Sequence, residues 1–459
     1  MPSFVNKDFL QKILRIAFPI AAQEFVVMAL NMVDIMMIGQ KGEAAVASVA
    51  LANQILFIQI ILMFGIGSSA SVFTAQYWGN RDLPNIRKIL GINLLLAVIS
   101  ALVLALMSHS FPQQIIGFYS KDPSVVALGA QYLRISCLGF IPMAITSAFS
   151  ASLRSTQHVR LPMVTSIIAL SINTGLNYCL IFGNLGFPEI GVLGASIATV
   201  TSRIIECAII IIFTYRYHTP SAGRFKEYFS FSRNEFIRYF KVGSPVILNE
   251  IIWVLGITIY NMVYARIGTQ SIAAYNISSS LDGLAFTLFI GLSHACAIIV
   301  GNQIGANNIQ QAVQDAKHSI QLAITLACIV GFLEVILGRL ALYVYQISPT
   351  AHEIAIKLLI ISGFTLLLRA SNMTIYIGII RSGGDTKFGL LTELGTIWLI
   401  GVPLALLGAF VFHLGAPIVA ILVAVEEAVK LLIGRHRFRS RKWINNLVSP
   451  DQNLIGNEL

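Results

Sequence analysis

One acidic side chain, Asp34, lies near the end of the first long apolar segment of this chain. A charged side chain at the centre of a bilayer costs roughly 2.5–3.5 kcal/mol on insertion scales. Such a residue persists where it faces protein or a water-filled cavity. We interpret Asp34 as a binding site for a proton or a monovalent cation, and a structural hydrogen bond is the alternative.

Two asparagines are predicted to lie at a similar depth. Asp34 is roughly 28 Å along its helix from Arg15, at the α-helical rise per residue. Asn173 and Asn177 are roughly 20–26 Å along theirs from Arg160, in a segment that runs in the same direction. They are spaced i,i+4 and share one helix face. The spacing therefore predicts amide neighbours for the carboxylate.

Each of the other polar residues in apolar segments has two possible roles. Thr199 and Ser202 either join the Asp34 cluster or bond to their own helix. Glu250 is a candidate ion-binding residue, although its recurrence as Glu24 also fits a structural role. Asp282 either lines a cavity or bonds to a neighbouring helix.

Two further spacings, Arg203 with Glu206 and Glu427 with Lys430, predict ion pairs within a helix.

The elements that hold these side chains are predicted from composition. The chain has 459 residues, of which 56% are hydrophobic and 11% charged, whereas soluble domains carry about 25% charge. Its apolar runs are about 20 residues long and do not alternate, which favours transmembrane helices over a β-barrel. Twelve spans are predicted, at residues 13–38, 46–76, 88–108, 124–152, 161–183, 190–214, 243–265, 271–302, 316–338, 351–379, 388–411 and 415–434.

The distribution of Lys and Arg predicts the orientation. With the N-terminus inside, the inner segments hold 22 of these residues and the outer loops hold Lys41, Lys121, Arg266 and Arg339. The positive-inside rule then places both termini in the cytoplasm and the chain in the cell membrane. The same rule accounts for the net charge of +10, so no nucleic acid partner is expected.

The two halves of the chain repeat at an offset near 226 residues. Pro19, Glu24, Gly65 and Gly79 recur as Pro245, Glu250, Gly291 and Gly305, and Arg154 recurs as Arg381. Asp34 has no acidic counterpart, because its equivalents are Tyr260 or Val263. Since each half has six spans, the repeats are expected to be parallel lobes related by a pseudo-two-fold axis along the membrane normal, with substrate bound between them. The predicted parts are an N-terminal lobe (1–214), a cytoplasmic linker (215–242), a C-terminal lobe (243–434) and a basic tail (435–459).

Four segments resemble the multidrug and toxic compound extrusion (MATE) family. They are Val33–Gly39, Ala75–Asp82, Leu153–Gln157 and Ile380–Lys387. The resemblance spans the chain in family order. It implies export of amphipathic, often cationic compounds driven by inward flow of protons or sodium ions. The expected partners are such small molecules and membrane lipid, the expected state is a monomer, and no cofactor beyond the coupling ion is expected.

The resemblance also implies roles for particular residues. It places Asp34 in a buried polar cluster with side chains of the fifth span, and some members have a second aspartate at the position of Asn177. A glutamate at the position of Glu250 is a cation-site residue in part of the family. The aspartate that accompanies it is missing from Arg369–Asn372, which weakens a two-carboxylate site there.

Two other classes of protein are less well supported. A flippase for lipid-linked precursors is the alternative transporter, but such proteins usually place several cationic residues in the central cavity. An enzyme is not expected, because the chain has no HExxH, G-x-S-x-G or Walker A motif and no clustered His and Cys ligands. We predict no metal centre beyond a monovalent cation at Asp34. The five cysteines are predicted to be small buried hydrophobic residues.

Overall fold

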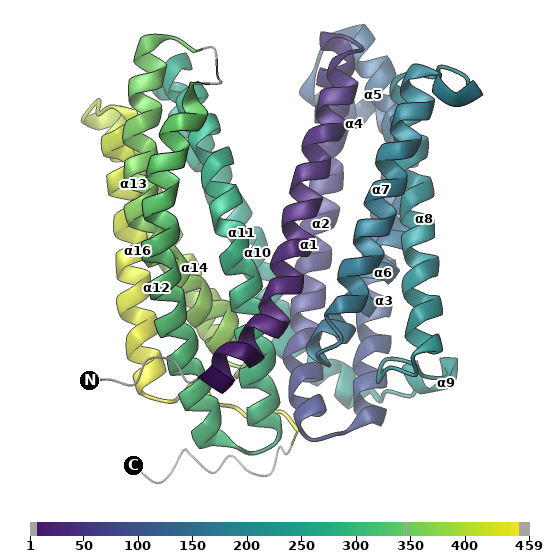
Figure 1. Cartoon of the computed structure of the whole chain (residues 1–459), viewed down its shortest axis with the longest axis vertical. Coiled ribbons are helices and arrows are strands. Elements are labelled where there is room, and N and C mark those ends of the chain that lie inside the picture. The colour runs from purple at the N-terminus through teal and green to yellow at the C-terminus, as the bar shows by residue number, and fades with distance from the viewer. Residues whose placement is uncertain (1–6, 344, 346, 449–459) are drawn as a thin grey trace. The chain divides into compact units, whose positions relative to one another are not determined.

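The computed structural model describes residues 7–343, 345 and 347–448, and its regular elements are helices (Figure 1). Eleven helical spans in this described part are long and apolar enough to cross a membrane. The helix α16 (Ala416–Arg439) follows them, at the position of the twelfth predicted span. It is less apolar because Glu426, Glu427 and Lys430 lie close together in it. The protein is therefore an all-α polytopic membrane protein, as the sequence predicts.

The described residues form two compact units. Residues 22–74 and 82–240 form one, which we call the N-terminal unit, and residues 7–21, 75–81 and 241–448 form the C-terminal unit. The first turns of α1 (Lys7–Gly39) and the last turns of α2 (Glu43–Gly79) thus belong to the C-terminal unit. The lobe boundaries drawn from the sequence remain a prediction.

The N-terminal unit is built from helices that begin at recognisable signals. Asp82 and Asp122 cap two of them by accepting hydrogen bonds from backbone N–H groups, and a proline follows each cap within two residues. One predicted span, 124–152, is broken by a 3₁₀ turn. After α1 and α2 come α3 (Leu83–Ser110), α4 (Pro112–Tyr119), α5 (Pro123–Ser136), the 3₁₀ turn η1 (Cys137–Gly139), α6 (Phe140–Ser155), α7 (Arg160–Phe182), η2 (Asn184–Gly186), α8 (Val192–Arg216) and α9 (Phe225–Tyr228).

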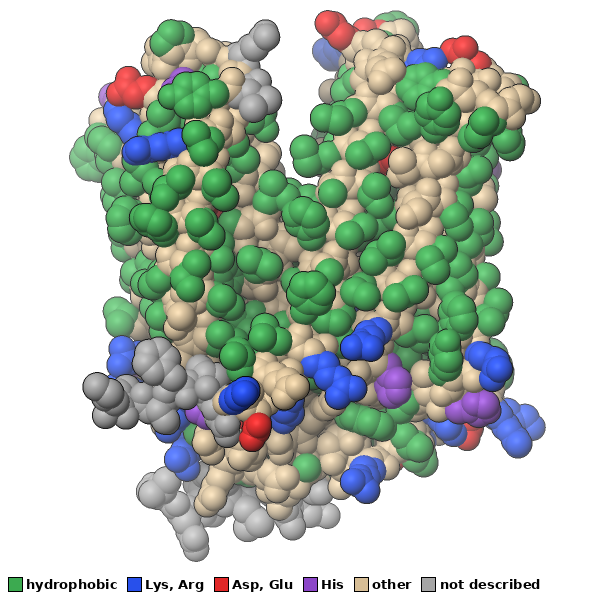
Figure 2. All heavy atoms as spheres, in the orientation of Figure 1, with side chains coloured by type: hydrophobic (Ala, Val, Ile, Leu, Met, Phe, Trp, Pro, Cys, Tyr) green, Lys and Arg blue, Asp and Glu red, His purple; other side chains and the backbone are tan. Residues whose placement is uncertain are grey.

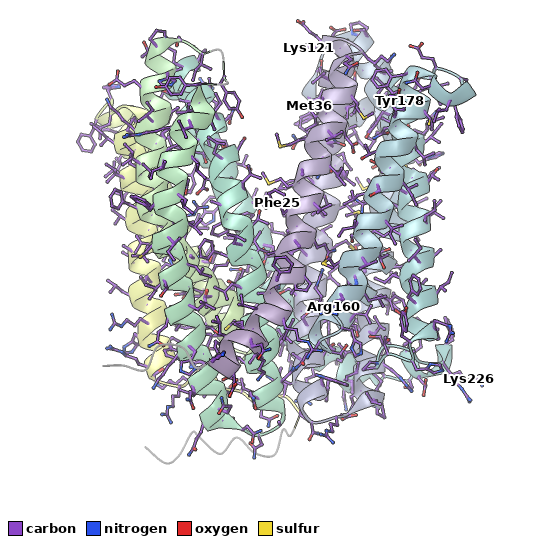
Figure 3. All side chains as sticks on the ribbon, in the orientation of Figure 1. Phe25, Met36, Lys121, Arg160, Tyr178 and Lys226 are labelled. Atoms are coloured by element: carbon purple, nitrogen blue, oxygen red, sulfur yellow. The ribbon has the colours of Figure 1, made fainter. Side chains whose placement is uncertain are left out.

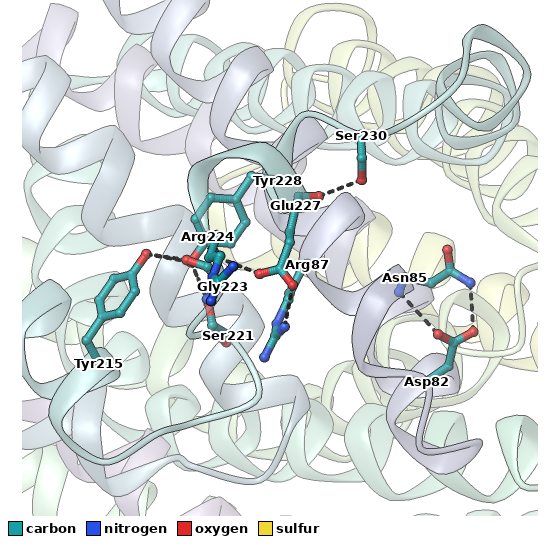
Figure 4. A network of polar contacts seen from close by, with 10 residues as sticks. All are labelled: Asp82, Asn85, Arg87, Tyr215, Ser221, Gly223, Arg224, Glu227, Tyr228 and Ser230. Carbon is teal, nitrogen blue, oxygen red and sulfur yellow. Dashed lines mark hydrogen bonds and ion pairs between the residues drawn. The ribbon is translucent and has the colours of Figure 1, made fainter.

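The segment predicted as a linker docks onto α3 (Figure 4). The Tyr228 hydroxyl donates to the Ser221 carbonyl at 2.8 Å and accepts from the Gly223 N–H at 2.9 Å. Arg87 of α3 pairs with Glu227 at 2.9 Å. A Cβ at Gly91 would lie 1.7 Å from the Tyr228 carbonyl oxygen, so glycine is needed for this approach. The segment is consequently held against the N-terminal unit.

The C-terminal unit begins within α10 (Arg233–Ile267). Wider π-helical turns interrupt its tenth and eleventh spans. Glycines bring α12 and α13 together, since a Cβ at Gly331 would lie 2.4 Å from the Gly363 carbonyl oxygen. The elements after α10 are α11 (Thr269–Gly305), α12 (Ile309–Leu342), α13 (Pro349–Met373), η3 (Thr374–Arg381), α14 (Thr386–Thr396), η4 (Ile397–Gly401), α15 (Val402–Leu406), η5 (Leu407–Val411) and α16.

The repeated glycines Gly79 and Gly305 meet at the ends of α2 and α11. A Cβ at Gly79 would lie 1.9 Å from the Asn302 carbonyl oxygen, and one at Gly305 would lie 1.8 Å from the Gln76 carbonyl oxygen. The two helix ends therefore cross in close backbone contact, on the C-terminal unit. This crossing is a physical reason for the recurrence of these glycines in the sequence.

The first part of the predicted tail is packed in the same place. The side chain of Gln76 donates to the carbonyl oxygens of Ser382 and Asn445 and accepts from the Leu447 N–H at 2.7 Å. Trp443 has no exposed surface. Residues 449–459 lie outside the described part of the chain.

The surface agrees with a membrane protein. Figure 2 shows hydrophobic side chains over the middle of the visible face and many Lys and Arg side chains near one end. Within the N-terminal unit, Arg160 and Lys226 lie toward the same end and Lys121 lies at the other (Figure 3). Four cysteines are buried as predicted, whereas Cys328 is exposed.

Candidate functional site

Asp34 is held by two asparagines of α7 in the N-terminal unit. The Nδ2 of Asn177 donates a 2.8 Å hydrogen bond to Asp34 Oδ1. Asn177 and Asn173 are buried, with 1% and 5% of their surfaces exposed. Met36 and Tyr178, which are close to Asp34 and Asn177 in sequence, lie in the half of the unit nearest Lys121 (Figure 3). The amide neighbours are those that the spacing predicts.

The amide of Asn173 can be placed in either of two orientations, which have different partners. With Nδ2 toward the carboxylate, it donates to Asp34 Oδ2 at 2.9 Å and its Oδ1 accepts from the Thr199 N–H at 3.2 Å. With the amide turned over, Oδ1 accepts from Asn177 at 3.3 Å and Nδ2 donates to Thr199 Oγ1 at 3.4 Å. An ionised carboxylate only accepts and favours the first orientation, whereas a protonated one can donate to Oδ1 in the second.

The two hydroxyls of α8 behave differently. Thr199 Oγ1 donates to the Ala195 carbonyl oxygen at 2.9 Å and remains an acceptor for Asn173. Ser202 Oγ donates to the Thr199 carbonyl oxygen at 2.9 Å. The structure therefore brings Thr199 into the cluster and gives Ser202 a bond within its own helix.

A cavity in the same unit adjoins this cluster. Tyr132, a buried residue of α5, interacts electrostatically with Asp34 and lines the cavity together with Thr199. Sequence reasoning missed Tyr132, because an aromatic residue in an apolar span carries no signal of its own. The cavity is lined by Ala52, Asn53, Leu56, Tyr132, Leu133, Ser136, Gly139, Phe140, Met143, Thr199 and Arg203.

Arg203 supplies a nearby positive charge that acts on Asp34 and is itself paired. Its guanidinium donates to Glu206 at 2.8 Å, the i,i+3 pair that the sequence predicts. The other oxygen of Glu206 accepts from Ser166 at 2.8 Å, and Ser166 accepts from Gln23 at 2.9 Å. This chain of bonds links α8, α7 and α1, and it leaves Asp34 as the carboxylate of the cluster without a salt bridge among the described residues.

The chemistry of the cluster follows from this donor set. One carboxylate with amide and hydroxyl neighbours can take up a proton or hold a weakly coordinated monovalent cation. Among the described residues no group of three or more His, Cys, Asp and Glu side chains could hold a metal ion. Divalent cations require more carboxylate oxygens than this cluster offers.

The other two candidates, Glu250 and Asp282, lie in the C-terminal unit. Glu250 pairs with Arg381 at 2.8 Å, and Arg381 also donates to Asn249. In the N-terminal unit the repeat-equivalent residues Glu24 and Arg154 also interact electrostatically. A recurring pair explains why both charges recur in the sequence.

Asp282 has partners on a neighbouring helix. Arg369 of α13 donates to both of its oxygens, at 2.8 and 2.7 Å, and Ser362 donates to one of them at 2.7 Å. Of the two readings of Asp282, the structure shows the bond to a neighbouring helix. A bidentate geometry makes this a strong pair.

The predicted pair of Glu427 with Lys430 is wrong. Lys430 forms its salt bridge with Glu393 of α14, and Glu427 accepts from Asn372 of α13 at 2.6 Å. An i,i+3 spacing permits a pair within one helix, but in a dry bundle the neighbouring helices offer competing partners. The sequence contains no signal for a pairing that joins α14 to α16.

A bundle of apolar helices with one carboxylate–amide cluster is typical of a membrane transporter, and comparison identifies the family. The MatE family model matches residues 19–179 and again residues 245–407. The two matches begin at Pro19 and Pro245, the offset that the internal repeat predicts. The chain belongs to the MATE family of multidrug efflux transporters and is a multi-pass membrane protein.

Relatives and solved structures agree with this assignment. The probable multidrug resistance protein NorM of Photorhabdus laumondii is 27% identical over 88% of this chain and 88% of its own. NorM of Thermotoga maritima is 24% identical over 90% of this chain and 89% of its own. A crystal structure of MATE in the bent conformation shares the fold, with a TM-score of 0.85 at 20% identity over 94% of this chain and 96% of that one.

Proposed function

We propose that this protein is a secondary antiporter that exports amphipathic, often cationic compounds in exchange for protons or sodium ions. The observation that carries the proposal is the bond between Asn177 and Asp34, a membrane-embedded carboxylate held by amides. A group held in this way can exist both loaded and empty, because its neighbours satisfy either form. Relatives named as multidrug resistance proteins support the substrate class.

The orientation of the Asn173 amide depends on whether Asp34 is ionised or protonated. When Asp34 is ionised, both asparagines donate to it. When Asp34 holds a proton, its O–H donates to Asn173 Oδ1 and the amide turns its Nδ2 to Thr199. Occupancy of Asp34 thereby changes a contact between α7 and α8. An ion that makes different contacts in two states shifts their populations.

Methionines of α1 support an amphipathic substrate. Met32 and Met36 are exposed, and Met36 has 67% of its surface accessible. Two residues along a helix correspond to a rotation of about 200°, so both lie on the face opposite Asp34. Soft, flexible side chains suit compounds of varied shape. Substrate and coupling ion would therefore use opposite faces of the same helix.

The proposal includes the orientation of the chain in the membrane. We place both termini in the cytoplasm and the chain in the cell membrane, because the sequence concentrates Lys and Arg in the segments of that side. Asp34 then lies in the outer half of the bilayer. From there it can exchange its ion with the outer medium.

Purified protein in vesicles with separately imposed proton and sodium gradients tests the proposal. We expect one gradient, directed inward, to drive a fluorescent cationic dye outward, and the other to have little effect. A single carboxylate among amides favours the proton. If neither gradient drives dye movement, the antiport proposal is wrong.

A lipid-linked precursor flippase is disfavoured by the partners of the basic residues. Arg203, Arg369 and Lys430, all within spans, form ion pairs with acidic side chains. Their charges are thus neutralised by carboxylates, which leaves them poorly suited to bind a phosphate headgroup. Scrambling of a labelled lipid by the same vesicles, without dye export, would favour the flippase instead.

A further inference from the structure

Glu334 is a buried carboxylate with no hydrogen-bond partner on either oxygen among the described residues. It lies on α12 in the C-terminal unit, and 7% of its surface is exposed. Residues 331, 334 and 338 share one helix face by their spacing. Gly331 and Gly338 on this face pack against Gly363 and Leu359 of α13. Close packing on both sides of Glu334 keeps water from its carboxylate.

The charged groups that act on Glu334 come from two helices packed against α12, namely α11 and α13. α11, α12 and α13 pack against one another (Figure 1). Asp282 of α11 and Arg369 of α13 act electrostatically on Glu334. Arg369 also interacts with Glu427 of α16, and Tyr275 of α11 interacts with both members of the Asp282–Arg369 pair. The acidic groups outnumber the basic ones in this cluster.

Arg369 is already committed to another carboxylate. It donates to both oxygens of Asp282, at 2.8 and 2.7 Å, and its guanidinium lies 4.6 Å from the centre of the Phe286 ring. The Ser362 hydroxyl donates a hydrogen bond to Asp282 at 2.7 Å. The hydroxyl nearest to an ionised Glu334, that of Ser362, thus already donates to Asp282, whereas a protonated Glu334 could donate to the free lone pair of Ser362 Oγ.

We propose that Glu334 is a second proton-binding site, built on the α12–α13 interface and separate from Asp34. It holds its proton while this interface is closed and releases it when water enters. Glu334 lies eight residues before the end of α12 at Leu342, roughly 12 Å at the helical rise, so water has a short path to it.

Infrared difference spectroscopy of the full chain in lipid vesicles tests this site directly. We expect the neutral-pH spectrum to contain a carbonyl band of a protonated carboxylic acid that disappears at alkaline pH. The band should be lost in Glu334→Gln. It should remain in Glu353→Gln, which removes an exposed carboxylate paired with Lys357 on α13. A band that is equal in wild type and Glu334→Gln overturns the proposal.

Glu334→Asp provides a second test in case the glutamine variant does not fold. It keeps the acid but shortens the side chain, so its band should persist at a shifted frequency. If Glu334→Gln does not fold, a band of unchanged frequency in Glu334→Asp overturns the proposal by itself.

A role of Glu334 in proton-coupled dye export rests on the proposed antiport function. We then expect Glu334→Gln to move about one proton fewer per dye molecule than wild type, measured with a pH-sensitive dye inside the vesicles. An unchanged ratio overturns this part. Failure of wild-type vesicles to export dye at all overturns the antiport proposal and leaves the infrared result standing.

Discussion

Asn177 of α7 donates a hydrogen bond of 2.8 Å to Asp34 of α1, and this bond joins two helices that are long and apolar enough to cross a membrane. It gives an ionised carboxylate a partner without giving it a countercharge. We expect a proton or cation bound at Asp34 to compete with the amides of α7 for the carboxylate oxygens.

Asn177→Asp should shift the pH dependence of dye export toward alkaline pH. Two carboxylates in contact cannot both ionise easily, so the pair retains a proton over a wider range. Initial rates of export measured over a pH series check this. Asn184→Asp adds the same charge in η2, outside the cluster, and should leave the profile in place. Profiles of the two variants that coincide would contradict the prediction.

Glu250→Ala should destabilise the C-terminal unit. Removing one partner of a buried ion pair typically costs about 3–5 kcal/mol, because the other charge loses its compensation. The Glu250→Ala, Arg381→Ala double variant should recover part of this loss. Thermal unfolding in detergent measures both. A single variant as stable as wild type would show that the Glu250–Arg381 pair has no structural role.

Glu227→Gln should loosen the docked segment between α8 and α10. The Arg224 N–H and then the Arg87 guanidinium hold the pKa of Glu227 below its usual 4.5. Its contribution is present above the pKa of the unfolded chain and is lost as the pH falls through the lowered folded value. Hydrogen exchange at residues 221–228, corrected for intrinsic rates, should rise in the variant at neutral pH. In acid the variant and wild type should converge, and a difference that persists there would contradict this account.

Gly91→Ala should separate the docked segment from α3. The new Cβ would meet the Tyr228 carbonyl oxygen at 1.7 Å, and overpacking of this kind costs about 1–3 kcal/mol. Gly175→Ala is the matched control, because a Cβ there meets nothing within 4 Å. Alanine in an unobstructed helix should stabilise by about 0.5–1 kcal/mol. Equal melting temperatures for the two variants would argue against the close approach.

The sequence predicts the Asp34 cluster well because its signals are local. A carboxylate in an apolar run marks a site, and i,i+4 spacing places Asn173 and Asn177 on one helix face. The depth estimate needs nothing more than the helical rise. The internal repeat likewise matches Glu24 with Glu250 and Gly79 with Gly305. In the structure each glutamate interacts with an arginine, and the two glycines lie at a close helix crossing.

The remaining features depend on the register between helices, which a single sequence does not contain. Lys430 could reach Glu427 on its own helix, yet it binds Glu393 on another. Nothing in the sequence distinguishes Glu334 from other acidic residues in the spans. Its burial follows from the packing of Gly331 and Gly338 against α13. The 3₁₀ turn at Cys137–Gly139 and the π-helical turns likewise have no signal in the sequence.

Dye export by Asp34→Asn in vesicles under an imposed ion gradient tests the central claim most directly. Asparagine keeps the shape of the side chain and can still bond to Asn177, so the variant should fold and bind dye. It cannot take up or release a proton and offers a cation no charge. We predict that the gradient no longer drives export. Export at the wild-type rate would contradict the assignment of Asp34 as the coupling site.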